Sequence, residues 1–332
     1  MNIRPSPLQR IVRNRTIYRA CFPLWPIVFE QFDLSPYELI ISSCALWAKG
    51  VITKPETCHI CFCYTPPRLA WRYHESVAYE DFNPLIRLLL AIWTKSYRQW
   101  DLAASSRVDY FIADSFNAAR RIFKYYRRIS TVIHPPVNAS RYLISDEPGN
   151  HFLIVSRLNP YKRIDIAVQA FNQLGLRLKI VGTGPDEPRL RKIAKPNIEF
   201  MGRVSDQLLS ELYARCQALI LPGEEDYGIT PLEAQASGRP VIAYGAGGAL
   251  ETVIEGTTGI FFHEQTPEAL IEALKSFDAK QFDPIVIRRH ALNFDKDAFK
   301  QEVSRFVQEK YKEHIMHMQM KNSSPVYGFP VP

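Results

Sequence analysis

The chain has 332 residues, of which 46% are hydrophobic and 23% are charged, and its formal net charge is +7. This composition excludes an intrinsically disordered chain, and the length allows two domains of ordinary size. The apolar runs fall short of the roughly 18–20 residues of a membrane-spanning helix, and the N-terminus lacks the apolar core of a secretory signal. Six cysteines do not make a disulfide framework in a chain of this length, so we expect a reducing, cytoplasmic location.

The basic residues gather in two clusters. One is formed by the arginines that precede the first acidic residue, Glu30, and the other lies within 120–128. Such clusters are compatible with binding to an anionic membrane, to nucleic acid or to an anionic small molecule, and also with simple solvation of helix faces. For the first cluster we expect peripheral contact with the anionic inner face of a membrane, although the apolar residues at 24–29 are equally compatible with packing inside a domain. We expect no nucleic-acid partner.

Three cysteines lie close together at Cys58, Cys61 and Cys63. A zinc site is conceivable, but no second Cys/His pair follows at ligand spacing. We therefore favour a buried strand with small thiol side chains, and we expect no metal site in the chain.

Regular elements are predicted along most of the chain. Less regular patterns in the first half predict strands over 39–42, 59–63, 110–113 and 131–133 and helices over 86–97 and 116–126. The proline-bearing segment 134–137 is typical of a connector between domains. After it, strands over 151–156, 176–181, 198–201, 218–221 and 240–243 alternate with helices over 161–174, 187–194 and 205–215. Such alternation predicts a parallel sheet with helices on both faces.

Charged side chains and glycines directly follow several of the later strands. Arg157 and Lys162 follow the first strand of the second half, and Glu225 and Glu233 follow the strand over 218–221. Ligands bind at the carboxyl ends of parallel strands, where two cations and a helix N-terminus suit a diphosphate and carboxylates suit hydroxyl groups. The glycine-rich turn at 245–248 would let a ligand approach the backbone closely. Each feature alone is compatible with solvated charge or an ordinary turn, but their shared position favours a ligand site.

These residues resemble the donor-binding domain of retaining glycosyltransferases of family 4, which have the GT-B fold. The likeness is carried by the segments 155–162, 200–205, 225–233 and 247–253. The first half resembles the mannosyltransferase-like branch of surface-polysaccharide assembly at 41–43, 59–68, 109–115 and 133–137. The resemblance extends roughly from residue 7 to residue 311.

The resemblance implies an α/β fold of GT-B type, in which two Rossmann-like domains face a cleft. Residues 1–140 are then the acceptor-side domain, 141–296 the nucleotide-sugar donor-binding domain, 297–315 a C-terminal helix that packs back toward the first domain, and 316–332 a loose tail. Relatives usually begin with a strand and a Gly-rich loop, which this chain lacks ahead of its matching part, so the N-terminal domain is expected to be incomplete.

The resemblance also assigns roles to single residues. Arg157 and Lys162 would hold the donor diphosphate, Glu225 would contact the transferred sugar, and Glu233 would bind the ribose hydroxyls. The expected catalytic residues are Arg157, Lys162 and Glu225. The expected donor-binding residues are Arg157, Lys162, Gly228, Ile229, Thr230, Glu233, Gly247 and Gly248.

The implied activity is transfer of a hexose, with mannose as the expected sugar, from a nucleotide-diphosphate donor. GDP-mannose or a UDP-sugar would be the donor, a glycan or lipid-linked saccharide the acceptor, and the anomeric configuration would be retained without a metal or other cofactor. Relatives usually carry His where this chain has Tyr64, and often another where it has Ala45. Because Tyr does not act as a near-neutral base, the alternative is a truncated or catalytically impaired nucleotide-sugar-binding homologue that works by association.

Overall fold

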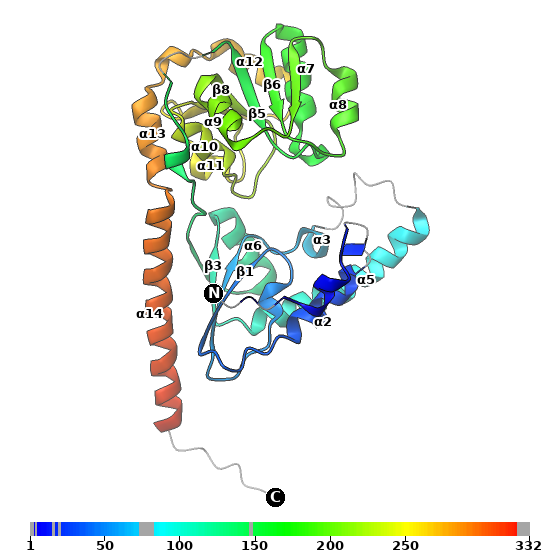
Figure 1. Cartoon of the computed structure of the whole chain (residues 1–332), viewed down its shortest axis with the longest axis vertical. Helices are drawn as coiled ribbons and strands as arrows, with labels where there is room; N and C mark the ends of the chain where they lie inside the picture. The colour runs from blue at the N-terminus through cyan, green and yellow to red at the C-terminus, as the bar shows by residue number, and fades with distance from the viewer. Residues whose placement is uncertain are drawn as a thin grey trace, which may run out of the picture. The chain divides into compact units, whose positions relative to one another are not determined.

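The computed structural model describes residues 3, 5–14, 17–18, 21–72, 83–145 and 149–323. The chain divides into two compact units (Figure 1). Unit 1 comprises Met1–Asp114, Ala118–Ile133 and Gln301–Pro332, and unit 2 comprises Ser115–Asn117 and His134–Lys300. Of the N-terminal arginines, Arg4, Arg15 and Arg19 lie outside the described residues, as do 324–332 of the segment predicted to be a tail.

Unit 1 is built on a parallel sheet in the order β1-β2-β3-β4. The four strands are β1 (Leu39–Cys44), β2 (Cys58–Cys63), β3 (Tyr110–Ala113) and β4 (Ser130–Val132). All four predicted strands are therefore confirmed, with small shifts at their ends. The helices of this part are α2 (Trp25–Glu30), α3 (Arg68–Trp71), α5 (Pro84–Ser106) and α6 (Phe116–Tyr126).

The cysteines of β2 face opposite sides of the sheet. Cys61 and Cys63 pack with Cys44 in the core cluster that also contains residues of β3 and α6, whereas Cys58 alternates to the other face. Every residue of β2 is buried, which confirms the predicted buried strand. Burial raises the pKa of the Cys58 thiol to about 12, with a smaller contribution from Asp109, so this thiol is protonated near neutral pH.

A buried ion pair lies between the turn after β1 and helix α5. Lys49 and Asp101 are both fully buried and form a salt bridge. Trp71 Nε1 and Tyr126 Oη each donate a hydrogen bond to Asp101 Oδ2 at 2.7 Å. Burial, the largest single effect, would lower the pKa of Lys49, but the contact with Asp101 and the charges of Asp101, Cys44 and Cys63 together raise it. Lys49 thus stays protonated, and the pair with its hydrogen-bonding partners links three helices to the turn after β1.

The sequence left open whether the apolar residues at 24–29 contact a membrane or pack inside a domain, and the structure shows some of them partly buried and others exposed. Trp25 and Phe29 pack against an aromatic cluster around Trp47, whereas Leu24 and Ile27 are 47% and 56% exposed. Part of the segment is therefore core, and part remains at the surface.

Unit 2 contains a second parallel sheet, in the order β10-β9-β8-β5-β6-β7. Its strands are β5 (His151–Val155), β6 (Arg177–Val181), β7 (Ile198–Gly202), β8 (Cys216–Leu221), β9 (Val241–Tyr244) and β10 (Gly259–Phe262). The parallel sheet predicted from strand–helix alternation is confirmed.

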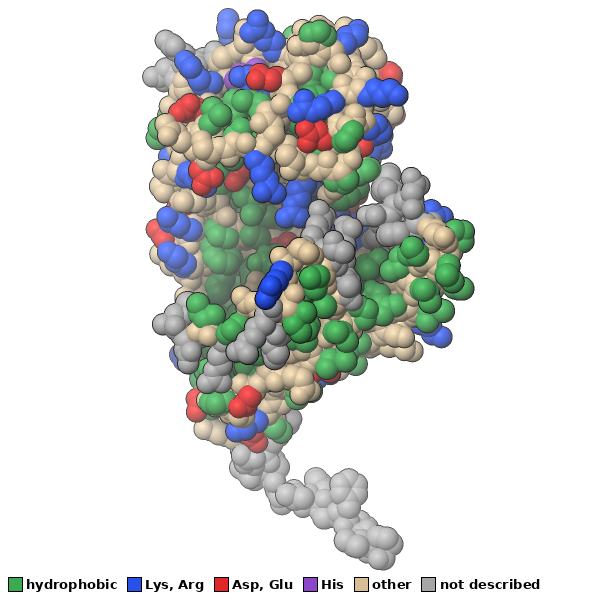
Figure 2. Space-filling model, turned by 45° about the vertical axis from the view of Figure 1, so that its right-hand side comes forward, with side chains coloured by type: hydrophobic (Ala, Val, Ile, Leu, Met, Phe, Trp, Pro, Cys, Tyr) green, Lys and Arg blue, Asp and Glu red, His purple; other side chains and the backbone are tan. Residues whose placement is uncertain are grey.

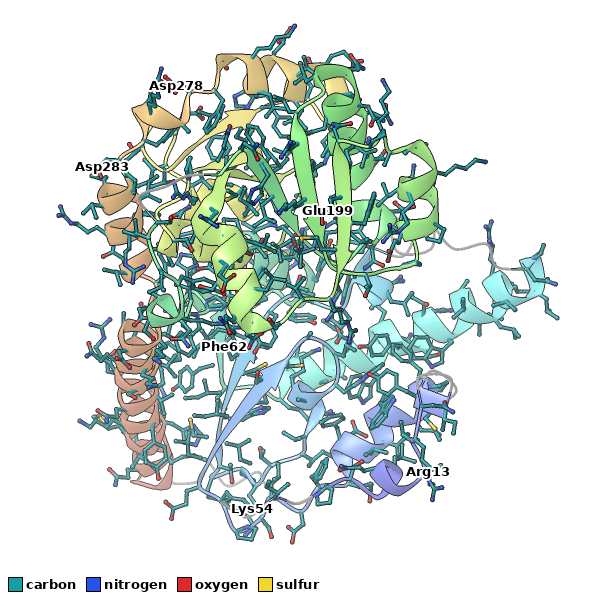
Figure 3. The ribbon with its side chains drawn as sticks, turned by 45° about the horizontal axis from the view of Figure 1, so that its top comes forward. Arg13, Lys54, Phe62, Glu199, Asp278 and Asp283 are labelled. Atoms are coloured by element: carbon teal, nitrogen blue, oxygen red, sulfur yellow. The ribbon has the colours of Figure 1, made fainter. Side chains whose placement is uncertain are left out.

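Helices cover both faces of this sheet (Figure 1). One core cluster joins the sheet to α7 (Ile164–Leu174), α8 (Glu187–Ile193) and α12 (Pro267–Ser276). The other joins it to α9 (Asp206–Arg215), α10 (Thr230–Ala236), α11 (Ala249–Thr252) and α13 (Pro284–Leu292). Asp283, labelled in Figure 3, caps α13 by accepting a hydrogen bond from the backbone N–H of Ile285 at 2.8 Å.

Three helices differ clearly from their predicted bounds. Helix α5 spans Pro84–Ser106, where the sequence predicted only 86–97. Arg163 adopts a left-handed conformation with φ of 53°, so α7 begins at Ile164 and Lys162 lies in the preceding 3-10 turn, Pro160–Lys162. The last helix, α14, spans Lys296–Ser323, so 316–323 are helical where the sequence predicted a loose tail. Met, Gln and Lys in this segment are good helix formers, and the first proline after it is Pro325. Within the described residues, no helix is long and apolar enough to cross a bilayer.

The buried ion pair provides a test of unit 1. Replacing Lys49 with Met leaves Asp101 buried without its counter-charge, so we expect a loss of about 3–5 kcal/mol in the free energy of unfolding. The double variant Lys49→Met/Asp101→Leu removes both charges and should recover much of that loss. Urea denaturation followed by circular dichroism measures both, with the exposed Lys95→Met as the control. If the single and double variants lose the same free energy of unfolding, neutralisation of the buried Asp101 charge by Lys49 does not account for the effect.

Candidate functional site

The strand order of unit 2 creates a switch point between β5 and β8. From β5 the chain proceeds to β6 and β7 on one side and then returns to place β8 and β9 on the other. The loops that follow β5 and β8 therefore leave the same edge of the sheet in opposite directions. In open parallel sheets this is the place where ligands bind.

Lys162 and Glu225 meet at this edge. Lys162 follows β5 and Glu225 follows β8, and their side chains form a salt bridge between Nζ and Oε1. The two side chains are only 15% and 16% exposed, so the pair is shielded from water more than an ordinary surface pair. Lys162 Nζ also lies 5.3 Å from the centroid of the Tyr161 ring. Two of the predicted site residues are thus brought into direct contact.

Glycines allow the surrounding loops to approach this pair. A Cβ on Gly223 would lie 2.6 Å from the carbonyl oxygen of Lys162, so only glycine lets the loop after β8 reach the loop after β5. A Cβ on Gly248 would lie 2.1 Å from the carbonyl oxygen of Tyr227. The Gly248 N–H donates to the carbonyl of Glu225 at 2.9 Å, and Gly247 forms a parallel bridge with the same residue. The predicted turn at Gly247–Gly248 therefore supports the backbone of Glu225, and the Gly248 N–H is already used.

Glu233 is held by two tyrosines. Tyr142 Oη donates to Glu233 Oε1 and Tyr213 Oη donates to Glu233 Oε2, each at 2.7 Å. Burial and the charge of Glu233 raise the pKa of both phenols, so they remain donors. A carboxylate offers about four lone-pair positions, so two remain for further donors. Neither tyrosine was found from the sequence, because both are far from Glu233 in the chain and no local motif marks them.

The other predicted site residues occupy the same loops. Arg157 is exposed on the loop after β5 and makes no ion pair or side-chain hydrogen bond with any residue in the described parts of the chain. Gly228, with φ of 86°, and Ile229, which is 41% exposed, lead into α10, and Thr230 is its first residue. Their roles toward a ligand stay predictions.

Tyr64 lies at the corresponding edge of the sheet of unit 1. It directly follows β2, is 39% exposed, and its Oη lies 2.8 Å from the Oγ of Ser43 in β1. A hydroxyl pair at this position can donate and accept hydrogen bonds near neutral pH, but it does not take up a proton as an imidazole does.

One known family matches a segment that lies almost entirely in unit 2. Residues 140–301 match the family described as "Glycosyl transferases group 1". The chain is 26% identical over 221 residues to a D-inositol 3-phosphate glycosyltransferase from Geodermatophilus obscurus, which covers 56% of this chain and 49% of that protein. The chain thus spans about half the length of such curated relatives.

Solved structures agree on the fold. A sucrose-phosphate synthase from Thermosynechococcus elongatus gives a TM-score of 0.71 at 18% identity, covering 90% of this chain and 80% of that one. Anabaena HepE, solved in complex with UDP-glucose, gives a TM-score of 0.59 at 15% identity, covering 82% of this chain and 99% of that one. These likenesses confirm the expected α/β fold of GT-B type with parallel sheets. Together with the family match they support the resemblance found in the sequence, without singling out its mannosyltransferase branch.

The glycine contacts predict a local effect of substitution. In Gly248→Ala the new methyl group would collide with the carbonyl of Tyr227, so we expect the loop that carries Glu225 to loosen, at a cost of about 1–3 kcal/mol. Hydrogen–deuterium exchange resolved by peptide should become faster over 223–228. The control is Gly256→Ala, where φ is also positive, at 71°, but no atom lies within 4 Å of the new Cβ. Unchanged exchange over 223–228 in Gly248→Ala would contradict the supporting role.

Proposed function

We propose that this protein is a glycosyltransferase that moves a hexose from a nucleotide-diphosphate sugar to a glycan or lipid-linked acceptor with retention of configuration. The observation that carries this function is the Lys162–Glu225 pair, which lies at the β5/β8 switch point inside the segment that matches glycosyl transferases group 1. A cation for phosphate and an acid for sugar hydroxyls are adjacent there, as a nucleotide sugar requires.

The donor diphosphate is proposed to bind between the two cations that follow β5. Arg157 is exposed, and Lys162 is paired with Glu225. Helix α7 begins directly afterwards, and no side chain of the described residues caps its first turn, so its N–H groups add positive potential. As the nucleoside diphosphate leaves, its negative charge grows, and cations already in place stabilise it more than they stabilise the bound donor.

The carboxylates are proposed to bind hydroxyl groups of the donor. Glu225 would accept hydrogen bonds from the transferred sugar once the diphosphate competes for Lys162. Glu233 keeps acceptor positions beyond those filled by Tyr142 and Tyr213, and these suit the ribose hydroxyls. Two tyrosines that fix the carboxylate in one orientation would lower the entropy cost of binding.

The proposed reaction retains configuration by displacement on the front face of the sugar. In this scheme the departing phosphate oxygen takes the proton of the acceptor hydroxyl, so no protein carboxylate forms a covalent intermediate. Arg157 and Lys162 supply the charge stabilisation for the leaving group, and we propose that no metal or other cofactor is needed. Mannose from GDP-mannose is the first sugar to test, followed by UDP-sugars.

Nucleotide binding tests the role of Lys162. Removing one charge-assisted contact costs about 1.5–3 kcal/mol, so Lys162→Met should weaken binding of GDP or UDP by about 10- to 100-fold in calorimetry. The exposed Lys192→Met, on α8, should leave binding unchanged. Equal affinity in the Lys162 variant and the parent protein would remove Lys162 from the donor site.

Turnover separates the proposed enzyme from a binding homologue. Donor hydrolysis and transfer are measured with GDP-mannose, UDP-glucose and UDP-galactose, with and without a membrane extract as the acceptor source. We expect the parent protein to turn over a donor. In Glu225→Gln, turnover should fall by a larger factor than donor affinity, because this variant keeps the shape of the side chain and loses its charge. Nucleotide binding without turnover of any donor would instead favour the alternative, a nucleotide-sugar-binding homologue that works by association.

Peripheral membrane contact is proposed for unit 1. Helix α5 exposes several large apolar side chains in its first half, and hydrophobic side chains crowd the surface where this helix lies (Figure 2). The same half contains Arg87 and Lys95 and no acidic residue. The exposed apolar residues are Leu85 at 63%, Ile86 at 45%, Leu88 at 57%, Leu89 at 58% and Ile92 at 58%.

Vesicle flotation tests this contact. The protein should float with vesicles that contain anionic lipid at low salt, and less at high salt, because the basic residues are screened. Leu88→Glu/Leu89→Glu should reduce flotation, whereas Ile285→Glu, at a residue of α13 that is 56% exposed, should not. The contact is excluded if the parent protein stays unbound at low salt.

A further inference from the structure

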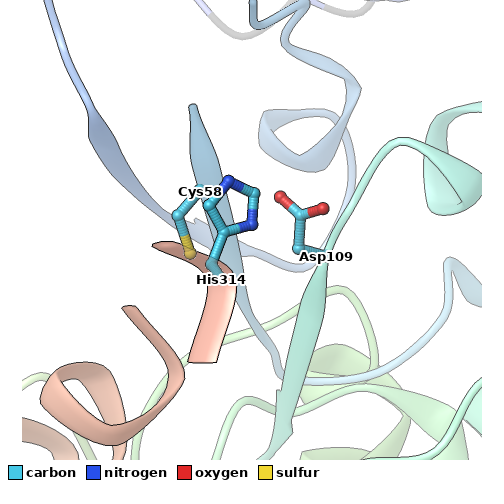
Figure 4. Close-up of side chains that lie close together, drawn as sticks. All are labelled: Cys58, Asp109 and His314. Atoms are coloured by element: carbon cyan, nitrogen blue, oxygen red, sulfur yellow. The ribbon is translucent and has the colours of Figure 1, made fainter. Parts of the chain in front are cut away.

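Three potential metal ligands converge in unit 1, at a place separate from the candidate donor site (Figure 4). The Cys58 Sγ, a carboxylate oxygen of Asp109 and a ring nitrogen of His314 all lie within 4.8 Å of one another. Cys58 is the first residue of β2, Asp109 directly precedes β3, and His314 lies on α14. The sequence predicted no metal site: it leads us to expect a C-terminal helix that packs back toward the first domain, but it does not show that His314 of this helix reaches Cys58 and Asp109.

The cluster lies at the amino ends of the strands of unit 1. One turn before His314, Tyr311 Oη donates to Glu38 Oε2 at 3.0 Å, and Glu38 directly precedes β1. Ligands of open parallel sheets bind at the opposite, carboxyl ends. The cluster is thus placed to join α14 to the sheet, away from the edge that carries Tyr64.

The Asp109 and His314 side chains are oriented by the backbone around them. The His59 N–H donates to Asp109 Oδ2 at 2.7 Å, and the Asp109 N–H donates to the carbonyl of His59 at 3.0 Å. His314 Nε2 lies 3.1 Å from the carbonyl oxygen of Glu56, which can only accept, so Nε2 carries the proton. In the neutral ring Nδ1 then has a free lone pair. A histidine that donates its second ring N–H to a backbone carbonyl is the usual arrangement of a metal ligand.

A catalytic role for the thiol and the imidazole conflicts with their burial. Cys58 is fully buried and His314 is 8% exposed. A nucleophilic cysteine must be reached by its substrate, and Cys58 is not exposed to solvent. Asp109 is exposed, so the cluster borders solvent on that side.

We propose that Cys58, Asp109 and His314 bind a divalent transition-metal ion, with Zn²⁺ preferred, that fastens α14 to the sheet of unit 1. Sulfur, imidazole and carboxylate ligands suit Zn²⁺, whereas Mg²⁺ and Ca²⁺ prefer oxygen alone. In a tetrahedral site with Zn–ligand bonds of about 2.0–2.3 Å, ligand atoms lie about 3.3–3.7 Å apart, so separations of up to 4.8 Å need to shorten by about 1 Å at most. On binding, the S–H bond of Cys58 breaks, its proton passes to water, and a metal–sulfur bond forms. Water completes the coordination on the exposed side.

Cobalt substitution tests the site in the full-length protein without an affinity tag. After treatment with a chelator, one equivalent of Co²⁺ should produce a thiolate-to-cobalt charge-transfer band and the strong visible bands of a tetrahedral ion, and Zn²⁺ should displace both. Cys58→Ser should abolish the charge-transfer band, and His314→Gln should weaken Co²⁺ binding by about 10- to 100-fold or more. The matched controls Cys21→Ser and His317→Gln, a partly exposed thiol and an exposed histidine on α14, should bind Co²⁺ like the parent protein.

Stability supplies a second, independent measurement. Zn²⁺ should raise the melting temperature of the parent protein and not that of Cys58→Ser, because a ligand that binds only the folded state stabilises it. If Cys58→Ser does not fold, Asp109→Asn replaces it, since Asp109 is exposed and its variant should remain folded with weakened Co²⁺ binding. No charge-transfer band in the parent protein, or an undiminished band in Cys58→Ser, would overturn the site. These outcomes do not depend on nucleotide binding by unit 2.

Discussion

The candidate site depends on close backbone contact between the loops that follow β5, β8 and β9. Gly223 lies against the carbonyl of Lys162, and Gly248 lies against the carbonyl of Tyr227, at separations that no side chain would allow. Because of these contacts the Lys162–Glu225 pair forms across two loops that are distant in the chain. The glycines therefore act on the charged groups indirectly, by setting where the backbone that carries them can lie.

The two units use opposite ends of their parallel sheets in different ways. In unit 2 the carboxyl ends of β5 and β8 present a cation, an acid and an uncapped helix start, which is the chemistry of anionic sugar donors. In unit 1 the amino ends of β2 and β3 meet α14, where thiol, imidazole and carboxylate groups converge. Within unit 1, the buried Lys49–Asp101 pair links helices α3, α5 and α6. The proposed donor site and the proposed metal site therefore lie at different edges, each within its own unit.

The accuracy of sequence prediction differs between elements for physical reasons. The strands of unit 2 were found because each is a short apolar run between a helix and a turn, a local signal. The start of α7 was missed because the left-handed Arg163 is not a glycine, and α14 was drawn too short because polar, Met-bearing residues beyond His314 carry little periodicity. Tyr142 and Tyr213, which hold Glu233, were invisible because their contact is entirely tertiary.

The sequence by itself determined the α/β alternation, the parallel sheet of unit 2 and the candidate residues that follow its strands. It did so because strand and helix patterns, and charges beside strand ends, are properties of short segments. Only the tertiary structure decided that Lys162 pairs with Glu225, that the Gly248 N–H is used by the Glu225 carbonyl, and that Cys58 meets His314. Those pairings depend on strand order and on the return of α14, and residues distant in the chain carry no local mark of the partner that folding gives them.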